Sequence, residues 1–89
     1  MAKIEIYTTP TCPFCIHAKQ LLDSKQLTYQ EIDVSRTPEL RQEMMTRAQK
    51  HTVPQIFIDM KSIGGCDELF ALNNSGELDK IISKSNTTT

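Results

Sequence analysis

The chain has 89 residues, 38% of them hydrophobic, and its 10 basic side chains nearly balance its 11 acidic ones. This length allows one small domain and excludes a multidomain machine. The balanced charge argues against a nucleic-acid partner, and no stretch approaches the roughly 20 apolar residues that cross a bilayer.

The first third of the chain predicts a strand followed by a helix. Ile4 and Ile6 alternate with their neighbours in the pattern of a strand with one buried face, expected over residues 3–8. Pro13 suits the first turn of a helix, expected over residues 13–25. The inner stripe of this helix and its flanks are Cys15, Ala18, Leu22, Ile16 and Leu21, and the positions expected to face water are Lys19, Gln20 and Asp23.

Residues 28–33 form the second predicted strand, because Tyr29 and the β-branched side chains favour a pleated surface. A hydroxyl residue followed by Pro38 and Glu39 then predicts the start of a second helix. Its buried face is expected to contain Leu40, Met44 and Ala48. The aliphatic and methionine positions expected in the core are Leu22, Leu40, Met44, Met45 and Ile56.

The second half predicts a β-hairpin over residues 53–58 and 62–63, which ends at two glycines. Two helical segments follow, over residues 67–72 and 77–83, divided by a turn-rich cluster at residues 73–76.

The order of elements is β-α-β-α-β-β-α, in which a parallel crossover pair precedes a hairpin. We therefore predict an α/β fold with a mixed four-stranded sheet flanked by helices. A single domain is expected over residues 1–84, with a disordered polar tail over residues 85–89.

Cysteine chemistry is concentrated in Cys12-Pro13-Phe14-Cys15. Three cysteines, two of them close together, make a poor disulfide framework. The first residues lack the apolar core of a signal peptide, so we expect a cytoplasmic protein, where such a pair is more often catalytic or metal-binding than structural. The helix start favours the thiolate of Cys12, whereas Cys15 faces the apolar stripe and should stay a thiol until it resolves a mixed disulfide on Cys12.

A metal site is the alternative for these thiols. Cys66 is the only other cysteine, and His17 and His51 are not spaced as a ligand pair, so half of a zinc site is missing. We therefore predict redox chemistry and no metal, with His17 facing solvent.

Three motifs lie in order along the chain: Thr11-Cys12-Pro13-Phe14-Cys15, Thr52-Val53-Pro54 and Gly64-Gly65-Cys66-Asp67. Together they resemble the glutaredoxin family, most closely the small bacterial dithiol members of the glutaredoxin 3 type, over residues 3–82. The resemblance implies a thioredoxin fold and a glutathione-dependent thiol–disulfide oxidoreductase. In such an enzyme Cys12 attacks a disulfide, and Cys15 or glutathione resolves the intermediate.

The resemblance also implies a glutathione site. The Val53–Pro54 peptide is expected to be cis, so that Val53 offers its backbone to glutathione; a trans proline that starts an edge strand is the alternative. The N–H groups of Cys66 and Asp67 would bind a carboxylate, with the Asp67 side chain facing the glutathione ammonium, acting as a plain N-cap, or doing both. The implied glutathione-binding residues are Phe14, Arg41, Thr52, Val53, Pro54, Gly65, Cys66 and Asp67.

Two positions depart from the family pattern. Thr9 stands where many members carry a lysine that helps hold the glycine carboxylate of glutathione, so Arg41 either supplies the cation or is a solvated surface residue. Phe14 replaces the commoner tyrosine, which removes a hydroxyl and keeps the aromatic face. Cys66 is either a regulatory thiol or acts through its backbone.

Two other functions stay open. A glutaredoxin-like redoxin reduced by thioredoxin reductase shares the fold; Thr9 favours it, and the motif that begins at Gly64 argues against it. A glutathione-assisted iron–sulfur carrier usually has Gly or Ser in place of Pro13. The expected partners of this monomer are glutathione and disulfide-bearing or glutathionylated proteins, with ribonucleotide reductase as a family expectation.

Overall fold

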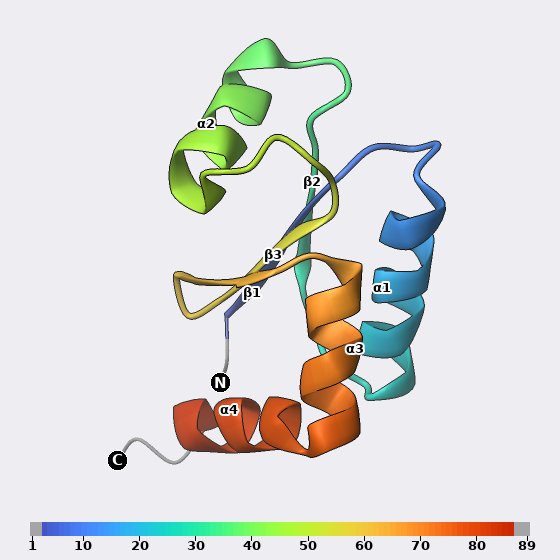
Figure 1. Cartoon of the computed structure of the whole chain (residues 1–89), viewed down its shortest axis with the longest axis vertical. Helices are drawn as coiled ribbons and strands as arrows, with labels where there is room; N and C mark the ends of the chain where they lie inside the picture. Colours follow the sequence, from blue (N-terminus) through green and yellow to red (C-terminus); the bar gives the residue numbers. More distant parts are fainter. Residues whose placement is uncertain (1–2, 87–89) are drawn as a thin grey trace.

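The computed structural model describes residues 3–86 and contains one four-stranded sheet with helices packed against it (Figure 1). The elements are β1 (Ile4–Thr8), α1 (Pro13–Ser24), β2 (Gln30–Asp33), α2 (Pro38–Ala48), β3 (Gln55–Ile58), β4 (Lys61–Gly64), α3 (Cys66–Ser75) and α4 (Glu77–Asn86). β1 pairs parallel to β2 and antiparallel to β3, and β3 pairs antiparallel to β4, which gives the order β2-β1-β3-β4. The predicted mixed sheet is confirmed.

The sheet separates two hydrophobic cores. Figure 1 shows α1 and α3 next to each other, with α2 apart from them across the sheet. The larger core lies beneath α1, α3 and α4 and contains Ile4, Ile6, Ala18, Leu22, Ile56, Ile58, Cys66, Leu69 and Leu78. The smaller core lies beneath α2 and contains Tyr7, Val34, Met44 and Phe57, with Leu40 and Ala48 packed against it. The predicted inner face of α2 is confirmed.

Strand β1 is buried on both faces, so the prediction of one buried face is wrong. Ile4 and Ile6 belong to the larger core, whereas Tyr7 belongs to the core beneath α2. The strand lies between β2 and β3, and helices cover both sides of the sheet there. Glu5 is only 7% exposed, and its burial is possible because Arg47 of α2 pairs with it at 3.1 Å.

Arg47 ties α2 to the sheet through several contacts. Besides pairing with Glu5, its guanidinium donates to the Tyr7 hydroxyl at 2.7 Å and lies 4.0 Å from the centroid of the Phe57 ring. The Tyr7 hydroxyl in turn donates to Glu43 at 2.5 Å. Burial, followed by the hydrogen bond to Glu43, raises the pKa of Tyr7, so this hydroxyl keeps its proton.

Three predictions of side-chain exposure on the helices are corrected. Met45 is 36% exposed rather than in the core, because its neighbour Met44 occupies the inward position on α2. Ile16 is exposed at 45%, since only Cys15, Ala18 and Leu22 of α1 are buried. Lys19, predicted to face water, is half-buried and pairs with Glu31 of β2.

The C-terminal helices also differ from their predicted bounds. Helix α3 continues through residues 73–75, and the predicted turn is confined to Gly76, whose φ of +83° ends the helix. Polar residues are tolerated there because tertiary packing outweighs their modest helix propensity. Helix α4 reaches Asn86, beyond the predicted end at residue 83. Residues 87–89 of the predicted tail lie outside the described residues.

Candidate active site

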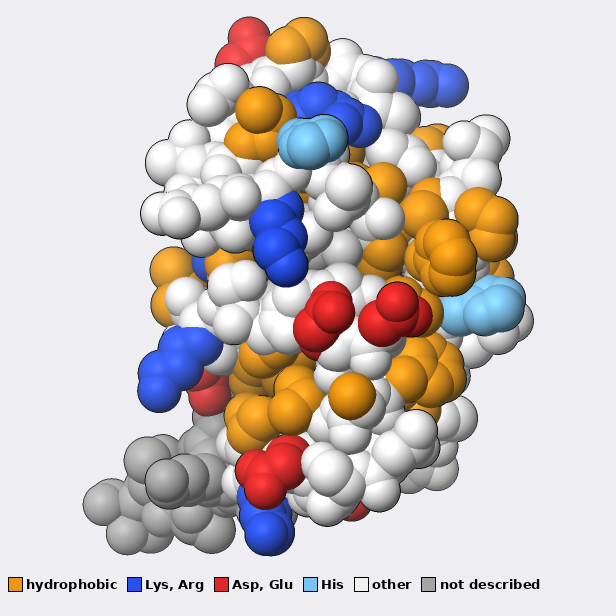
Figure 2. Space-filling model, viewed as in Figure 1, with side chains coloured by type: hydrophobic (Ala, Val, Ile, Leu, Met, Phe, Trp, Pro, Cys, Tyr) orange, Lys and Arg blue, Asp and Glu red, His pale blue; other side chains and the backbone are white. Residues whose placement is uncertain are grey.

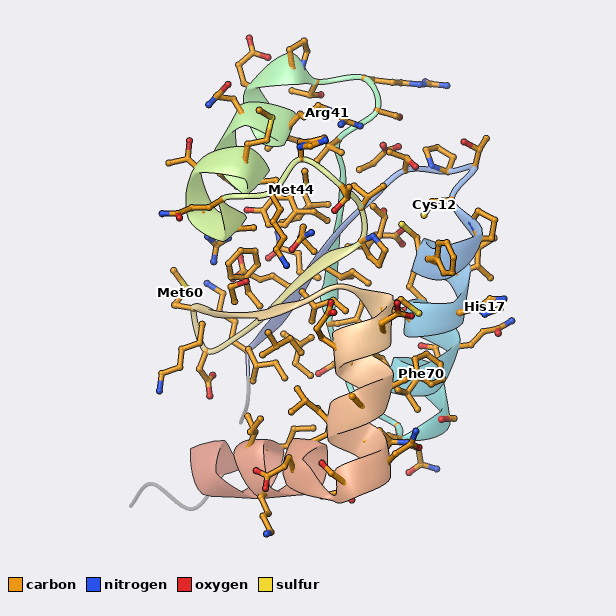
Figure 3. The ribbon with its side chains drawn as sticks, viewed as in Figure 1. Cys12, His17, Arg41, Met44, Met60 and Phe70 are labelled. Carbon is orange, nitrogen blue, oxygen red and sulfur yellow. The ribbon has the colours of Figure 1, made fainter. Side chains whose placement is uncertain are left out.

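Cys12 occupies the N-cap of α1, at the end of the loop that follows β1 (Figure 3). Its backbone is extended, and Pro13 at the first helical position starts the helix. The Cys12 sulfur accepts the Cys15 N–H at 3.3 Å, and its thiol donates to the Val53 carbonyl oxygen at 3.7 Å. The half-buried sulfur therefore contacts both the helix start and the loop before β3.

Cys15 lies one turn into α1 and is only 1% exposed. Burial, followed by the hydrogen bond with Cys12, raises the pKa of its thiol to about 12. Cys15 therefore keeps its proton at neutral pH, as its position on the apolar stripe predicts. The cysteines are free in this structure. One thiol is accessible and the other is held behind it.

The loop before β3 faces Cys12 with backbone groups. The Val53–Pro54 peptide is cis, as predicted. Gln55, which is 2% exposed, donates its side-chain amide to the Thr52 carbonyl at 3.0 Å and to the Thr52 hydroxyl at 3.2 Å. Gln55 is not among the predicted site residues, although a polar residue at the start of an apolar strand was an available signal.

Gly64 and Gly65 bring α3 close to this loop. Gly64 has a φ of +103°, and a Cβ on Gly65 would lie 3.0 Å from the Pro54 carbonyl oxygen. Gly65 is the N-cap of α3, and its N–H donates to Glu68 at 2.7 Å. Asp67 therefore lies in the first turn, so the N-cap alternative for it is wrong. Its side chain is exposed.

A surface groove lies between α1, the cis-proline loop and the start of α3. It is lined by Phe14, Lys50, Thr52, Val53, Pro54, Gln55, Gly65, Cys66, Asp67 and Glu68. Figure 2 shows acidic side chains in the middle of this face, with a basic side chain above them and hydrophobic side chains beside them. An elongated ligand with charges of both signs would find complementary groups here.

Arg41 is the one predicted glutathione-binding residue that does not line the groove. It lies on α2 (Figure 3), and its guanidinium donates to the His51 carbonyl oxygen at 3.3 Å. Lys50, which is not among the predicted site residues, brings a positive charge to the groove instead. Its place two residues before Thr52 was the signal that could have indicated it.

Comparisons with known proteins agree with this geometry. A family model described as Glutaredoxin matches residues 4–63. Glutaredoxin 3 of Escherichia coli (strain K12) is 50% identical over 82 residues, which cover 92% of this chain and 99% of that protein. The chain belongs to the glutaredoxin family. It is therefore one of a family of thiol–disulfide oxidoreductases.

Solved glutaredoxins have the same fold as this one. The solution structure of glutaredoxin from Brucella melitensis has a TM-score of 0.80 and 51% identity, covering 91% of this chain and 88% of that chain. A dithiolic glutaredoxin from Trypanosoma brucei brucei has a TM-score of 0.80 and 34% identity, and the match covers 89% of this chain and 84% of that chain. The predicted thioredoxin fold is confirmed.

Cys66 of this glutaredoxin is 8% exposed at the first position of α3. Burial, followed by the charge of Asp67, raises the pKa of its thiol. A buried, protonated thiol reacts slowly, which disfavours the regulatory role and favours a role for the Cys66 backbone.

His17 is exposed on the outer side of α1 and points away from Cys12 (Figure 3), as predicted. Within residues 3–86, no three His, Cys, Asp or Glu side chains are grouped as a metal site would require. No helix in that part of the chain is long and apolar enough to cross a membrane.

Proposed function

We propose that this glutaredoxin is a cytoplasmic, monomeric enzyme that reduces protein disulfides and glutathione mixed disulfides, with glutathione as its reductant. One observation carries the proposal. The Cys12 sulfur lies at a helix N-terminus, where it accepts the Cys15 N–H at 3.3 Å, while the buried Cys15 thiol waits one turn behind it. The accessible Cys12 sulfur is the nucleophile, and the Cys15 thiol resolves the mixed disulfide that forms on Cys12.

The reaction begins when the Cys12 thiolate attacks a substrate disulfide and one substrate thiolate leaves. A mixed disulfide now joins Cys12 to the other half of the substrate. Cys15 attacks the Cys12 sulfur, which releases that half and forms a Cys12–Cys15 disulfide. Two glutathione molecules then reduce this disulfide and leave as oxidised glutathione. When the substrate is a glutathionylated protein, a second glutathione can replace Cys15 in the resolving step.

Glutathione occupies the groove in this proposal. The backbone of Val53 pairs with its extended peptide, and the N–H groups at the start of α3 bind its γ-glutamyl carboxylate. The Asp67 carboxylate faces its ammonium group. Lys50 attracts its glycine carboxylate and replaces the charge that Thr9 does not supply, and Phe14 forms an apolar wall.

Reduction by thioredoxin reductase is the second candidate, because Thr9 removes one cation from the usual glutathione site. Two assays of the same reaction, the turnover of a small glutathione mixed disulfide, separate the two functions. In one assay the electrons come from glutathione and glutathione reductase, and in the other they come from thioredoxin reductase. We expect activity with glutathione only. Activity only with thioredoxin reductase would reject the glutathione-dependent function.

Replacing Cys15 tests the assigned roles, in which Cys12 is the nucleophile and Cys15 is the resolving thiol. The Cys15→Ser variant should keep its activity on glutathione mixed disulfides. Its rate of protein-disulfide reduction by the dithiol route should fall more than about 100-fold, because only this reaction requires a second protein thiol. Both activities are measured with the same glutathione supply. Loss of both would contradict the assigned roles.

A further inference from the structure

Lys19 is the basic side chain of α1, and the proposed redox chemistry assigns it no role. It lies one helical turn after Cys15, and its Nζ is 2.9 Å from Glu31 Oε2 of β2. The same Glu31 oxygen accepts the Thr8 hydroxyl of β1 at 2.8 Å. The side chain is 28% exposed and lines a hollow together with Pro10, which precedes the Cys12 motif. The ammonium group is therefore held in place by the sheet.

Cys15 needs help to become a nucleophile. Only a thiolate attacks a disulfide, and burial, followed by the hydrogen bond with Cys12, raises the pKa of Cys15 to about 12, so this thiol is protonated at neutral pH. Forming the mixed disulfide on Cys12 removes the influence of that sulfur, but the burial of Cys15 persists. The resolving step is thus limited by the charge that develops on a buried sulfur.

The titratable groups that act on Cys15 or lie on the elements near it come from α1 and its N-cap, from β2 and from α3. Cys12, the N-cap of α1, and Lys19 within α1 act on Cys15 directly. Glu31 of β2 pairs with Lys19, and Cys66 and Asp67 begin α3, which packs against α1. Among these groups, Lys19 alone carries a positive charge. Burial and the hydrogen bond with Cys12 raise the pKa of Cys15 most, and the charge of Lys19, one helical turn away, acts in the opposite direction. The hydrogen bond to Glu31 is the main cause that raises the pKa of Lys19, and the charge of Cys15 adds to it.

We propose that Lys19, held by Glu31 and Thr8, is a positioning residue whose ammonium charge stabilises the thiolate of Cys15 during the resolving step. The inference rests on the proposed roles of Cys12 and Cys15. In this step the Cys15 S–H gives its proton to solvent water, and the Cys15 sulfur forms a bond with Cys12. The bond between Cys12 and the substrate sulfur breaks, and the substrate leaves as a thiolate that takes up a proton from water. Cys12 and Cys15 are oxidised together as the substrate disulfide is reduced.

The expected effect follows from two opposing changes. Removing one positive charge near a thiol raises its pKa by about one unit, which lowers the thiolate fraction about tenfold. The remaining thiolate is about threefold more nucleophilic, because reactivity rises with basicity with a slope near 0.45. The net result is a resolving step about threefold slower in Lys19→Gln, with little change in Lys19→Arg.

Ellman's reagent measures the two steps separately, in a Cys66→Ser background that leaves only Cys12 and Cys15. Attack by Cys12 releases one thionitrobenzoate, and resolution by Cys15 releases a second. We expect Lys19→Gln to leave the first phase unchanged and to slow the second about threefold, by a factor that decreases as salt is added. Lys25→Gln is the matched control, because Lys25 follows α1 and pairs with Asp79 at 2.8 Å.

An unchanged second phase in Lys19→Gln would overturn the inference. So would equal slowing of both phases, or equal slowing in Lys25→Gln, because either result indicates a structural effect. Circular dichroism of each variant verifies that it is folded. The assay contains no glutathione, so a failure of glutathione-dependent turnover rejects the proposed function without altering this readout.

Discussion

Two charged clusters connect helices to opposite faces of the sheet, and they differ in burial. On the α2 side, Arg47 and Glu5 pair with side chains that are 21% and 9% exposed, within contact of Tyr7 and Phe57. On the α1 side, Lys19 and Glu31 pair at 28% and 41% exposure. Both pairs have similar distances, so the difference lies in how much water reaches them.

This difference in solvation assigns the two clusters different roles. A buried charge without its partner is strongly destabilising, so the Arg47 cluster holds α2 on the sheet. A half-exposed pair adds little to stability, because water competes with it. In the proposal above, the Lys19 charge acts on the Cys15 thiol, whereas Arg47 lies on the other side of the sheet from α1.

The largest effect is expected from Arg47→Met, which leaves the buried Glu5 carboxylate without its partner. We expect the free energy of unfolding to fall by about 3 kcal/mol, and the melting temperature to fall by roughly 15 °C. Urea and thermal unfolding measure these changes.

The double variant Arg47→Met with Glu5→Leu serves as the control, because it removes both charges. Most of the lost stability should return. If the single and double variants are equally unstable, the loss comes from packing rather than from an unpaired charge. Under conditions in which Arg47→Met is folded, the rates of both phases of its reaction with Ellman's reagent should equal those of the parent protein.

An intermediate effect is expected from Lys50→Gln, which removes the positive charge of the groove. An exposed cation paired with a carboxylate contributes up to about 1 kcal/mol, so KM for glutathione should rise about fivefold with little change in kcat. Steady-state turnover of a glutathione mixed disulfide provides the measurement. Arg41→Gln is the comparison, and a larger rise in that variant would assign the glutathione carboxylate to Arg41.

The smallest effect concerns the pH dependence of stability on the α1 side. The hydrogen bond from Lys19 lowers the pKa of Glu31 in the folded protein. A lowered carboxyl pKa stabilises the fold above the ordinary value of about 4.3, and this contribution disappears as pH falls through the folded value. Lys19→Gln should therefore be less stable than the parent by under about 1 kcal/mol at pH 7, and the difference should decrease when the pH is lowered from 7 to 3. Urea unfolding at both pH values checks this, and a difference that does not vary with pH would contradict it.

Local sequence signals predicted the elements that carry the thiols. Pro13 and the spacing of Cys12 and Cys15 act within one helical turn, so their arrangement follows from short-range geometry. The glycines at 64 and 65 likewise predicted a close approach of the backbone, and in the structure Gly65 lies close to the Pro54 carbonyl oxygen. The exposure of individual helical residues was harder to predict, since Met45 fits the same apolar pattern as the buried Met44.

The sequence by itself determined the order of the elements, the family and the position of the reactive thiols, because propensity, capping and short motifs depend on neighbouring residues. Tertiary structure alone decided which charges meet. Glu5 and Arg47 are 42 positions apart, and Lys19 and Glu31 are 12 apart. Their pairing depends on which helix covers which face of the sheet, and that is a property of the whole fold.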